Sequence, residues 1–140
     1  PDTWDATEAA RKALSGIYRF QQRRGQRFGA VHLIDVLRGK TTEKVRQFGH
    51  EELSTFGIGA DLSEQQWRAV LRQLVAAGHV SAEGEFNTLG LSESAREVLK
   101  GEVEVRLRVT REALAGITGV GEKKLEAYGD ELLALLHPTD

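Results

Sequence analysis

The sequence contains no cysteine, and this absence removes several classes of function at once. Disulfide bonds, thiolate metal sites and a cysteine nucleophile are all excluded. The four histidines are His32, His50, His79 and His137, and no two of them have the spacing of a metal-ligand pair. We therefore expect neither a metal nor another cofactor in this chain.

Long apolar runs and methionine are missing as well. No segment approaches the roughly 18 apolar residues that a membrane-spanning helix requires, and we expect no signal peptide. The 140 residues suit one domain, or one domain with a small appendage. Because long apolar runs are missing, we expect no membrane contact. Because the chain opens with Pro1-Asp2 and lacks methionine throughout, we expect a piece of a longer protein.

The net charge is small, at −2, but its distribution along the chain is uneven. Residues 1–50 contain ten Lys and Arg against five Asp and Glu, whereas residues 51–140 contain nine against sixteen. Binding of a polyanion depends on a local basic surface rather than on the total charge. The first half therefore favours a nucleic-acid contact, and the alternative is that its charges form only a solvated helix face.

Apolar residues that recur every three or four positions predict three helices in the first part of the chain. These helices fall within residues 7–25, 29–39 and 41–53, and we expect Thr7 to cap the first one. Gly16 lies inside that helix, where glycine costs about 1 kcal/mol relative to alanine. Its presence indicates that another backbone passes close by.

The clearest helical pattern lies within residues 61–79. Ser63 or Asp61 is expected to cap its start, and Ser63 and Gln66 have the spacing of a capping box. The apolar stripe of this helix comprises Trp67, Val70, Leu71, Leu74 and Val75. We interpret Trp67 as a core residue first and as a base-stacking residue second.

Strands are expected in two places after this helix. The segments HVSA and FNTLGL flank residues 83–85, a turn-sized gap that is typical of a β-hairpin. Ser92 is expected to cap a further short helix, and strict alternation over residues 102–109 predicts a half-buried strand. The chain is thus mostly α with a small β component. Three helices followed by a hairpin is the layout of a winged helix, which binds either DNA or another protein.

The segment Arg38-Gly39-Lys40-Thr41 raises the question of which phosphate the chain binds. A nucleotide-binding loop needs a glycine five positions before Gly39, where Ile34 stands, so we reject that interpretation. A helix that begins at Thr41 or Thr42 instead points free N–H groups and a partial positive charge toward a nucleic-acid backbone. Such contacts fix the position of a duplex without specifying its sequence. The predicted DNA-binding residues at this helix start and at the next one are Arg38, Lys40, Thr41, Thr42, Lys44, Arg46, Ser63, Arg68 and Arg72.

Longer motifs give the chain a family resemblance. They are Arg38-Gly39, Lys44, Gly49-His50, Phe56-Gly57-Ile58-Gly59, and Trp67 ahead of Arg72-Gln73-Leu74. In this order they closely resemble the winged-helix part of the RecQ DNA helicases, the RQC domain, and the similarity runs from about residue 5 to residue 109. The resemblance implies that residues 1–110 form an RQC-type winged helix.

The tail has a second resemblance, to the end of the HRDC domain that follows in bacterial RecQ proteins. Its G-V-G turn lies at Gly119 and Gly121, with Lys123 and Lys124 in the first turn of the next helix. Residues 111–140 would then form a short helical hairpin, a partial HRDC-like tail. The turn suits either a nonspecific nucleic-acid contact or the close packing of two helices.

RecQ-type enzymes couple ATP hydrolysis to 3′-to-5′ unwinding of DNA. The resemblance implies ATP, Mg and Zn for the parent helicase, whereas no catalytic motif stands in this chain. It implies duplex or forked DNA as the partner, with junction and G-quadruplex DNA as further candidates, and contact with the helicase core of the same polypeptide in the bacterial cytoplasm, at the nucleoid. The alternative is a winged-helix module that docks a protein through its acidic second half.

The same resemblance draws attention to the tip of the hairpin. Some relatives carry an aromatic wedge there, and Phe86 is the candidate in this chain. We interpret Phe86 as packing beneath the wing first, and as stacking on a terminal base pair second. Glu83 and Glu85 beside it would repel phosphates by about 1 kcal/mol each at close range.

Overall fold

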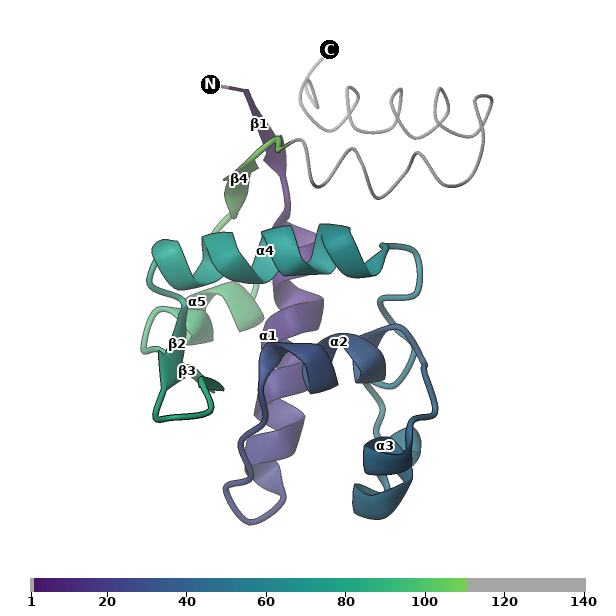
Figure 1. Cartoon of the computed structure of the whole chain (residues 1–140). Coiled ribbons are helices and arrows are strands. Elements are labelled where there is room, and N and C mark those ends of the chain that lie inside the picture. Colours follow the sequence, from purple (N-terminus) through teal and green to yellow (C-terminus); the bar gives the residue numbers. More distant parts are fainter. Residues whose placement is uncertain (1, 111–140) are drawn as a thin grey trace, which may run out of the picture.

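The computed structural model describes residues 2–110, which form a helical body with two small antiparallel sheets (Figure 1). The helices are α1 (Thr7–Gln22), α2 (Ala30–Leu37), α3 (Glu43–Phe48), α4 (Glu64–Ala76) and α5 (Ala95–Leu99), with a 3-10 turn η1 (His50–Glu52). The strands are β1 (Thr3–Asp5), β2 (Val80–Glu83), β3 (Thr88–Leu91) and β4 (Arg106–Arg108). The predicted mostly helical fold with a winged-helix layout is confirmed. The predicted hairpin over residues 111–140 lies outside the described residues.

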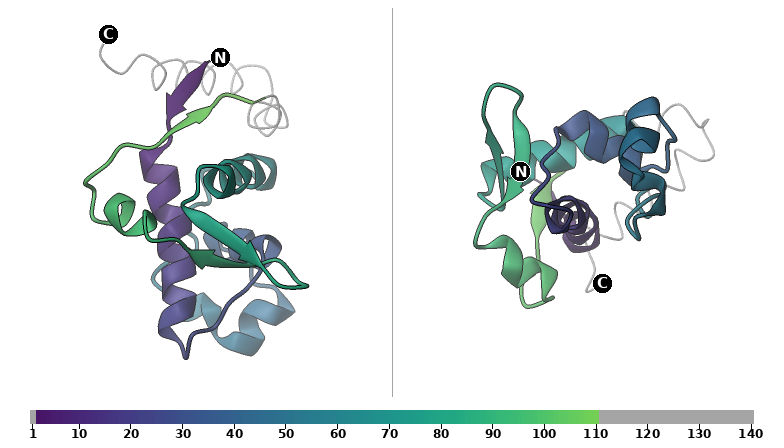
Figure 2. Two further views of the ribbon diagram at one scale, coloured as in Figure 1. Left: turned by 90° about the vertical axis from the view of Figure 1, so that its left-hand side faces the viewer. Right: turned by 90° about the horizontal axis from the view of Figure 1, so that it is seen from below.

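Helix α1 is the centre of the domain, and its predicted apolar stripe is fully buried. The neighbour of Gly16 is a side chain rather than the predicted backbone, because a Cβ at that position would lie 2.6 Å from the Cδ1 atom of Leu33 in α2. Seen from below, the β2–β3 hairpin and α3 lie on either side of α1 (Figure 2, right). Helix α2 can pack this close to α1 because residue 16 is a glycine and has no side chain.

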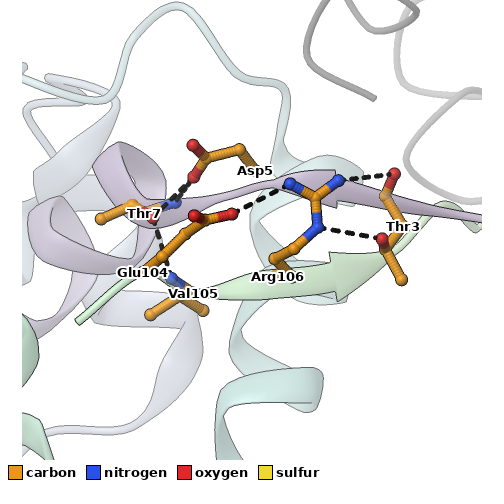
Figure 3. Close-up of polar contacts among 6 residues, drawn as sticks. All are labelled: Thr3, Asp5, Thr7, Glu104, Val105 and Arg106. Carbon is orange, nitrogen blue, oxygen red and sulfur yellow. Dashed lines mark hydrogen bonds and ion pairs between the residues drawn. The ribbon is translucent and has the colours of Figure 1, made fainter. Parts of the chain in front are cut away.

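The start of α1 differs from the expectation that Thr7 caps it. Thr7 is the first helical residue, and the carboxylate of Asp5 accepts hydrogen bonds from its backbone N (3.0 Å) and from its hydroxyl (2.6 Å). These hydrogen bonds lower the pKa of Asp5 below its ordinary value. The Thr7 hydroxyl oxygen then accepts a hydrogen bond from the backbone N of Val105 at 2.8 Å, which ties the helix start to a distant segment (Figure 3).

The strand predicted over residues 102–109 is shorter than expected, since only Arg106–Arg108 is extended and paired. Its partner is β1, which the sequence pattern did not reveal, with Trp4 opposite Leu107. Because β1 has only three residues, the ladder ends there, and Val103 is left 36% exposed. Arg106 fastens the pair by donating hydrogen bonds to Thr3 and Glu104 (Figure 3).

Helix α4 begins with the predicted capping box, in which Ser63 and Gln66 each accept a hydrogen bond from the other's backbone N–H. Trp67 is fully buried, which confirms its place in the core. Val75 departs from the predicted stripe, because it is 39% exposed. Its side chain lines a groove beside the wing hairpin.

The predicted hairpin is present as β2 and β3, paired from Val80 opposite Leu91 to Glu83 opposite Thr88. We call this hairpin, residues 80–91, the wing. The expectation that Ser92 caps the following helix is wrong, because the residue before α5 is Ser94 and it makes no capping bond. The Ser94 hydroxyl instead bonds the carbonyl of Gly78 and a ring nitrogen of His79.

Candidate nucleic-acid interface

The turn between α2 and α3 places its cations on the surface. Gly39 ends α2 with a φ of +72°, a conformation that favours glycine. Helix α3 was predicted to begin at Thr41 or Thr42; it begins at Glu43, and Thr42 caps it by accepting a hydrogen bond from the backbone N of Val45 at 3.0 Å. The side chains of Arg38 and Lys40 are exposed on this turn, so both can reach a ligand from solvent.

The same turn is held from its other side by the motif Phe56-Gly57-Ile58-Gly59. The backbone N–H groups of Gly57 and Gly59 donate to the carbonyls of Val36 (2.8 Å) and Leu37 (2.7 Å) at the end of α2. A Cβ at Gly39 would come within 3.2 Å of the Cα of Gly57. This motif therefore satisfies the carbonyl of Leu37, adds a second hydrogen bond to that of Val36, and fixes the turn that carries the cations.

Arg38 connects the two predicted helix starts. Its Nε donates to the carbonyl of Leu62 at 3.1 Å, in the loop that leads into α4. Part of its guanidinium is thus engaged by the protein, whereas Lys40 lies exposed on the same turn. At the start of α4, Arg68 forms an exposed ion pair with Glu64 at 2.9 Å, and such pairs contribute little stability.

A groove of about 900 Å³ lies between the wing, α2, α3 and α4. We call it the wing groove. It brings together four of the nine predicted DNA-binding residues, which come from separate segments, and the wing-tip Phe86; the four are Thr42, Lys44, Arg68 and Arg72. The other five do not line it; they are Arg38, Lys40, Thr41, Arg46 and Ser63. The predicted site is therefore a turn next to a groove rather than one continuous patch.

Several lining residues were not predicted, and three of them, Arg27, Phe28 and Gly29, come from the segment between α1 and α2. Arg27 donates to the carbonyl of Thr88 at 3.3 Å, forms an ion pair with Glu83 at 3.4 Å and covers Gly90 in the wing. Arg27 therefore holds the wing against the helical body. The sequence signal was only a cation that follows a helix-ending glycine, which is too common to indicate this contact.

Phe86 is 80% exposed, so the interpretation that it packs beneath the wing is wrong. By contrast, Trp67 is unavailable to bases, because it is fully buried and its indole N–H donates to the carbonyl of Gly59 at 2.7 Å. Of these two aromatic candidates, only Phe86 is placed to contact a ligand.

Two histidines meet under the turn, a contact that the sequence did not indicate. The Nε2 atom of His32 lies 2.8 Å from the Nδ1 atom of His50, and both rings are buried. Burial is the main reason that the pKa of each falls to about 4; the other histidine and Lys44 act further on His32, and Arg23 and Lys44 on His50. Both rings are therefore neutral near neutral pH.

Three phenylalanines surround this histidine pair, from α1, from α3 and from the segment before α2; they are Phe20, Phe48 and Phe28. The ammonium of Lys44 lies 5.3 Å from the centre of the Phe28 ring, within the range of a cation–π contact. The histidine pair thus packs against the Phe28 ring. Lys44, one of the predicted phosphate-binding cations, lies beside that ring.

Comparison with known families decides what kind of domain this is. The profile of the RQC domain matches residues 1–115. The chain belongs to the RQC domain family. An ATP-dependent DNA helicase RecQ from Pasteurella multocida is 37% identical over 97% of this chain and 21% of that protein. Proteins of the same name are 42% identical in Haemophilus influenzae and 33% identical in Bacillus subtilis, each over 79% of this chain and 18% of that protein.

The RQC chain thus spans about a fifth of the length of the relatives it matches. Within residues 2–110, no helix is long and apolar enough to cross a membrane. In the same range, no group of three or more His, Asp or Glu side chains is arranged to hold a metal ion. The residues predicted for the HRDC-like turn, Gly119, Gly121, Lys123 and Lys124, lie outside the described residues, and the domain division at residue 110 stays a prediction.

Proposed function

We propose that this RQC domain binds duplex DNA at a fork through the sugar-phosphate backbone, next to the motor of a RecQ-type 3′-to-5′ helicase. The observation that carries the proposal is the gathering of cations from α3 and α4 at one groove, beside an exposed cationic turn. Lys44, Arg68 and Arg72 come from two helices that are separate in sequence. Such a cluster provides the local field that attracts a polyanion even when the chain's total charge is slightly negative.

The type of contact follows from the side chains that the surface offers. Exposed Lys and Arg neutralise phosphates, and the Thr41 hydroxyl can donate to a phosphate oxygen. The aromatic side chain of α4, Trp67, lies in the core and does not reach a ligand. The domain would therefore position a duplex without selecting its sequence.

The wing would meet the end of the duplex. Phe86 is exposed at its tip and is free to stack on a terminal base pair. Glu83 and Glu85 flank the tip, but the ion pair with Arg27 offsets the charge of Glu83. A wing of this kind would touch bases through one ring and keep its carboxylates away from the phosphates.

The parent protein would supply the chemistry that this chain lacks. Its relatives are named as ATP-dependent DNA helicases, and ATP with Mg, together with a structural Zn, would belong to their remaining four fifths. Within that protein the RQC domain would hold the duplex while the helicase core pulls one strand. Junction and G-quadruplex DNA, and a contact through the HRDC-like turn, are extensions of the same proposal.

A salt titration tests this function. If four to six phosphates are neutralised, the logarithm of the binding constant for a forked duplex should fall with the logarithm of salt concentration, with a slope of about −4 to −5. Fluorescence anisotropy with a labelled fork measures this slope directly. No binding at about 50 mM salt would instead favour the alternative, a winged helix that docks a protein.

A further inference from the structure

The wing groove has an apolar side that backbone contacts with duplex DNA do not use. Five large apolar side chains are exposed within residues 2–110, and three of them line this groove. Val31 is 58% exposed, Val75 is 39% exposed and Phe86 is 80% exposed. They come from α2, α4 and the wing, so the fold assembles this surface from three separate elements.

The rim of the same groove is cationic. Arg27, Lys44, Arg68 and Arg72 line it, and Asp35 is the acidic residue among the lining residues. Arg27 and Arg68 have carboxylate partners in Glu83 and Glu64, whereas Lys44 contacts the face of Phe28. The groove therefore suits a ligand with an apolar face and a negative charge close to it.

We propose that the wing groove binds one unpaired nucleotide next to the end of the duplex. Its base would lie against Val31, Val75 and Phe86, and its phosphate would lie near Lys44. This inference rests on the proposed function and deepens it, because it adds a single-stranded subsite to a surface that otherwise grips backbone.

The apolar side of the groove suits an unpaired nucleotide better than a duplex. In a duplex the flat faces of the bases are stacked inside, and only sugars, phosphates and base edges reach a protein surface. A base outside the stack offers a π-face that apolar and aromatic side chains bind without regard to sequence. The volume of about 900 Å³ lies within the range of small-molecule sites, roughly 300 to 1,000 Å³.

The position of the groove favours nucleic acid over an acidic peptide as its occupant. Thr42 and Lys44 belong to the α2–α3 turn and α3, the proposed backbone-binding segment, and both also line the groove. If the phosphates of a strand lie on that turn, the next nucleotide of the strand lies at the entrance of the groove. An acidic peptide in the groove would have to compete with DNA phosphates for Thr42 and Lys44.

The test compares two DNA probes with the full 140-residue chain. One probe is a blunt duplex, and the other is the same duplex with one unpaired 2-aminopurine nucleotide at its end. We expect the unpaired nucleotide to tighten binding roughly tenfold, within the range that one stacked base contributes, and the 2-aminopurine fluorescence to be quenched. The double variant Val31→Gln with Val75→Gln should bind both probes equally while keeping the salt dependence of the blunt duplex.

The matched control is Val103→Gln, since Val103 is a comparably exposed apolar residue that does not line the groove. It should keep the preference for the unpaired nucleotide.

Equal binding of both probes by the unmodified chain, or a preference that survives the double variant, overturns the inference and leaves the backbone grip intact. Loss of blunt-duplex binding itself would count against the proposed function. Competition by an acidic, apolar peptide together with no preference between the probes would overturn the inference in favour of a protein partner.

Discussion

The indole N–H of Trp67 donates to the carbonyl of Gly59 at 2.7 Å, and the Trp67 ring fills the space in which a side chain at residue 59 would lie. A Cβ there would come within 2.5 Å of the ring. Gly59 also donates its backbone N–H to Leu37 at the end of α2. One glycine thus joins the buried face of α4 to the turn that carries Arg38 and Lys40.

The first prediction concerns this contact. Gly59→Ala should lower the free energy of unfolding by about 1 to 3 kcal/mol, because the added methyl group must displace a fully buried ring. Urea unfolding followed by tryptophan fluorescence measures the change. Gly29→Ala is the control, since a Cβ at Gly29 meets nothing closer than 3.8 Å and should cost much less. Equal losses in the two variants would show that the ring does not restrict residue 59.

The second prediction concerns pH. In the folded chain the pKa of both His32 and His50 is about 4, against 6.5 for the ordinary group. Between these values the unfolded chain binds more protons than the folded chain, so the free energy of unfolding should fall as pH falls from 6.5 to about 4. Above pH 6.5 these two groups should add little further dependence. Urea unfolding at a series of pH values provides the measurement.

The control for the pH prediction removes the titrating pair while keeping aromatic rings in place. The double variant His32→Phe with His50→Phe should show a flatter dependence of unfolding free energy on pH in this window, whatever its absolute stability. An unchanged slope would mean that groups other than this histidine pair dominate the response between pH 6.5 and about 4.

The third prediction concerns the junction drawn in Figure 3. Thr7→Val removes a hydroxyl that donates to Asp5 and accepts from the backbone N of Val105. Leaving that backbone N–H without its partner should lower the free energy of unfolding by about 1 to 3 kcal/mol. Thr41→Val is the matched control, because Thr41 is exposed and should tolerate the same change. Similar effects of the two substitutions would contradict this account.

The fourth prediction concerns the cationic turn. Lys40→Ala and Arg38→Ala should each weaken binding of forked DNA without changing sequence preference, and Lys40→Ala should reduce the salt slope by about 1. Arg38→Ala should also destabilise the fold slightly, since Arg38 bonds the carbonyl of Leu62. Anisotropy titrations with two fork sequences test both points, with Lys100→Ala after α5 as the control. A changed base preference would contradict a backbone contact, and undiminished binding by both variants would remove this turn from the site.

Periodicity was sufficient to predict α1 to α4 and the wing, and the capping signal was correct at α4, because these features depend on residues that are close in sequence. Ser63 and Gln66 show this most clearly, since their bonds lie within one helical turn. The pairing of β1 with β4 was missed because it joins residues about a hundred positions apart, such as Thr3 and Arg108. No local pattern encodes such a contact.

The candidate site was predicted less completely for the same reason. The sequence marks Lys44 and Arg68 as cations near helix starts, but not that they share a groove with Val31 and Val75. An exposed valine on an otherwise buried stripe has the same pattern as a core valine. Only the packing of α2 against α4 and the wing distinguishes the two cases.

The short β1–β4 ladder has a mechanical consequence. Thr3 lies opposite Arg108, and the backbone N of Val109 donates to the carbonyl of Asp2 at 3.0 Å, so residues 2 and 109 leave the ladder at the same end. Tension between the flanking segments of a longer polypeptide would break the hydrogen bonds of this ladder one after another, starting at that end, before the force reached α1. The wing and its neighbouring helices would keep their shape while the tether yields.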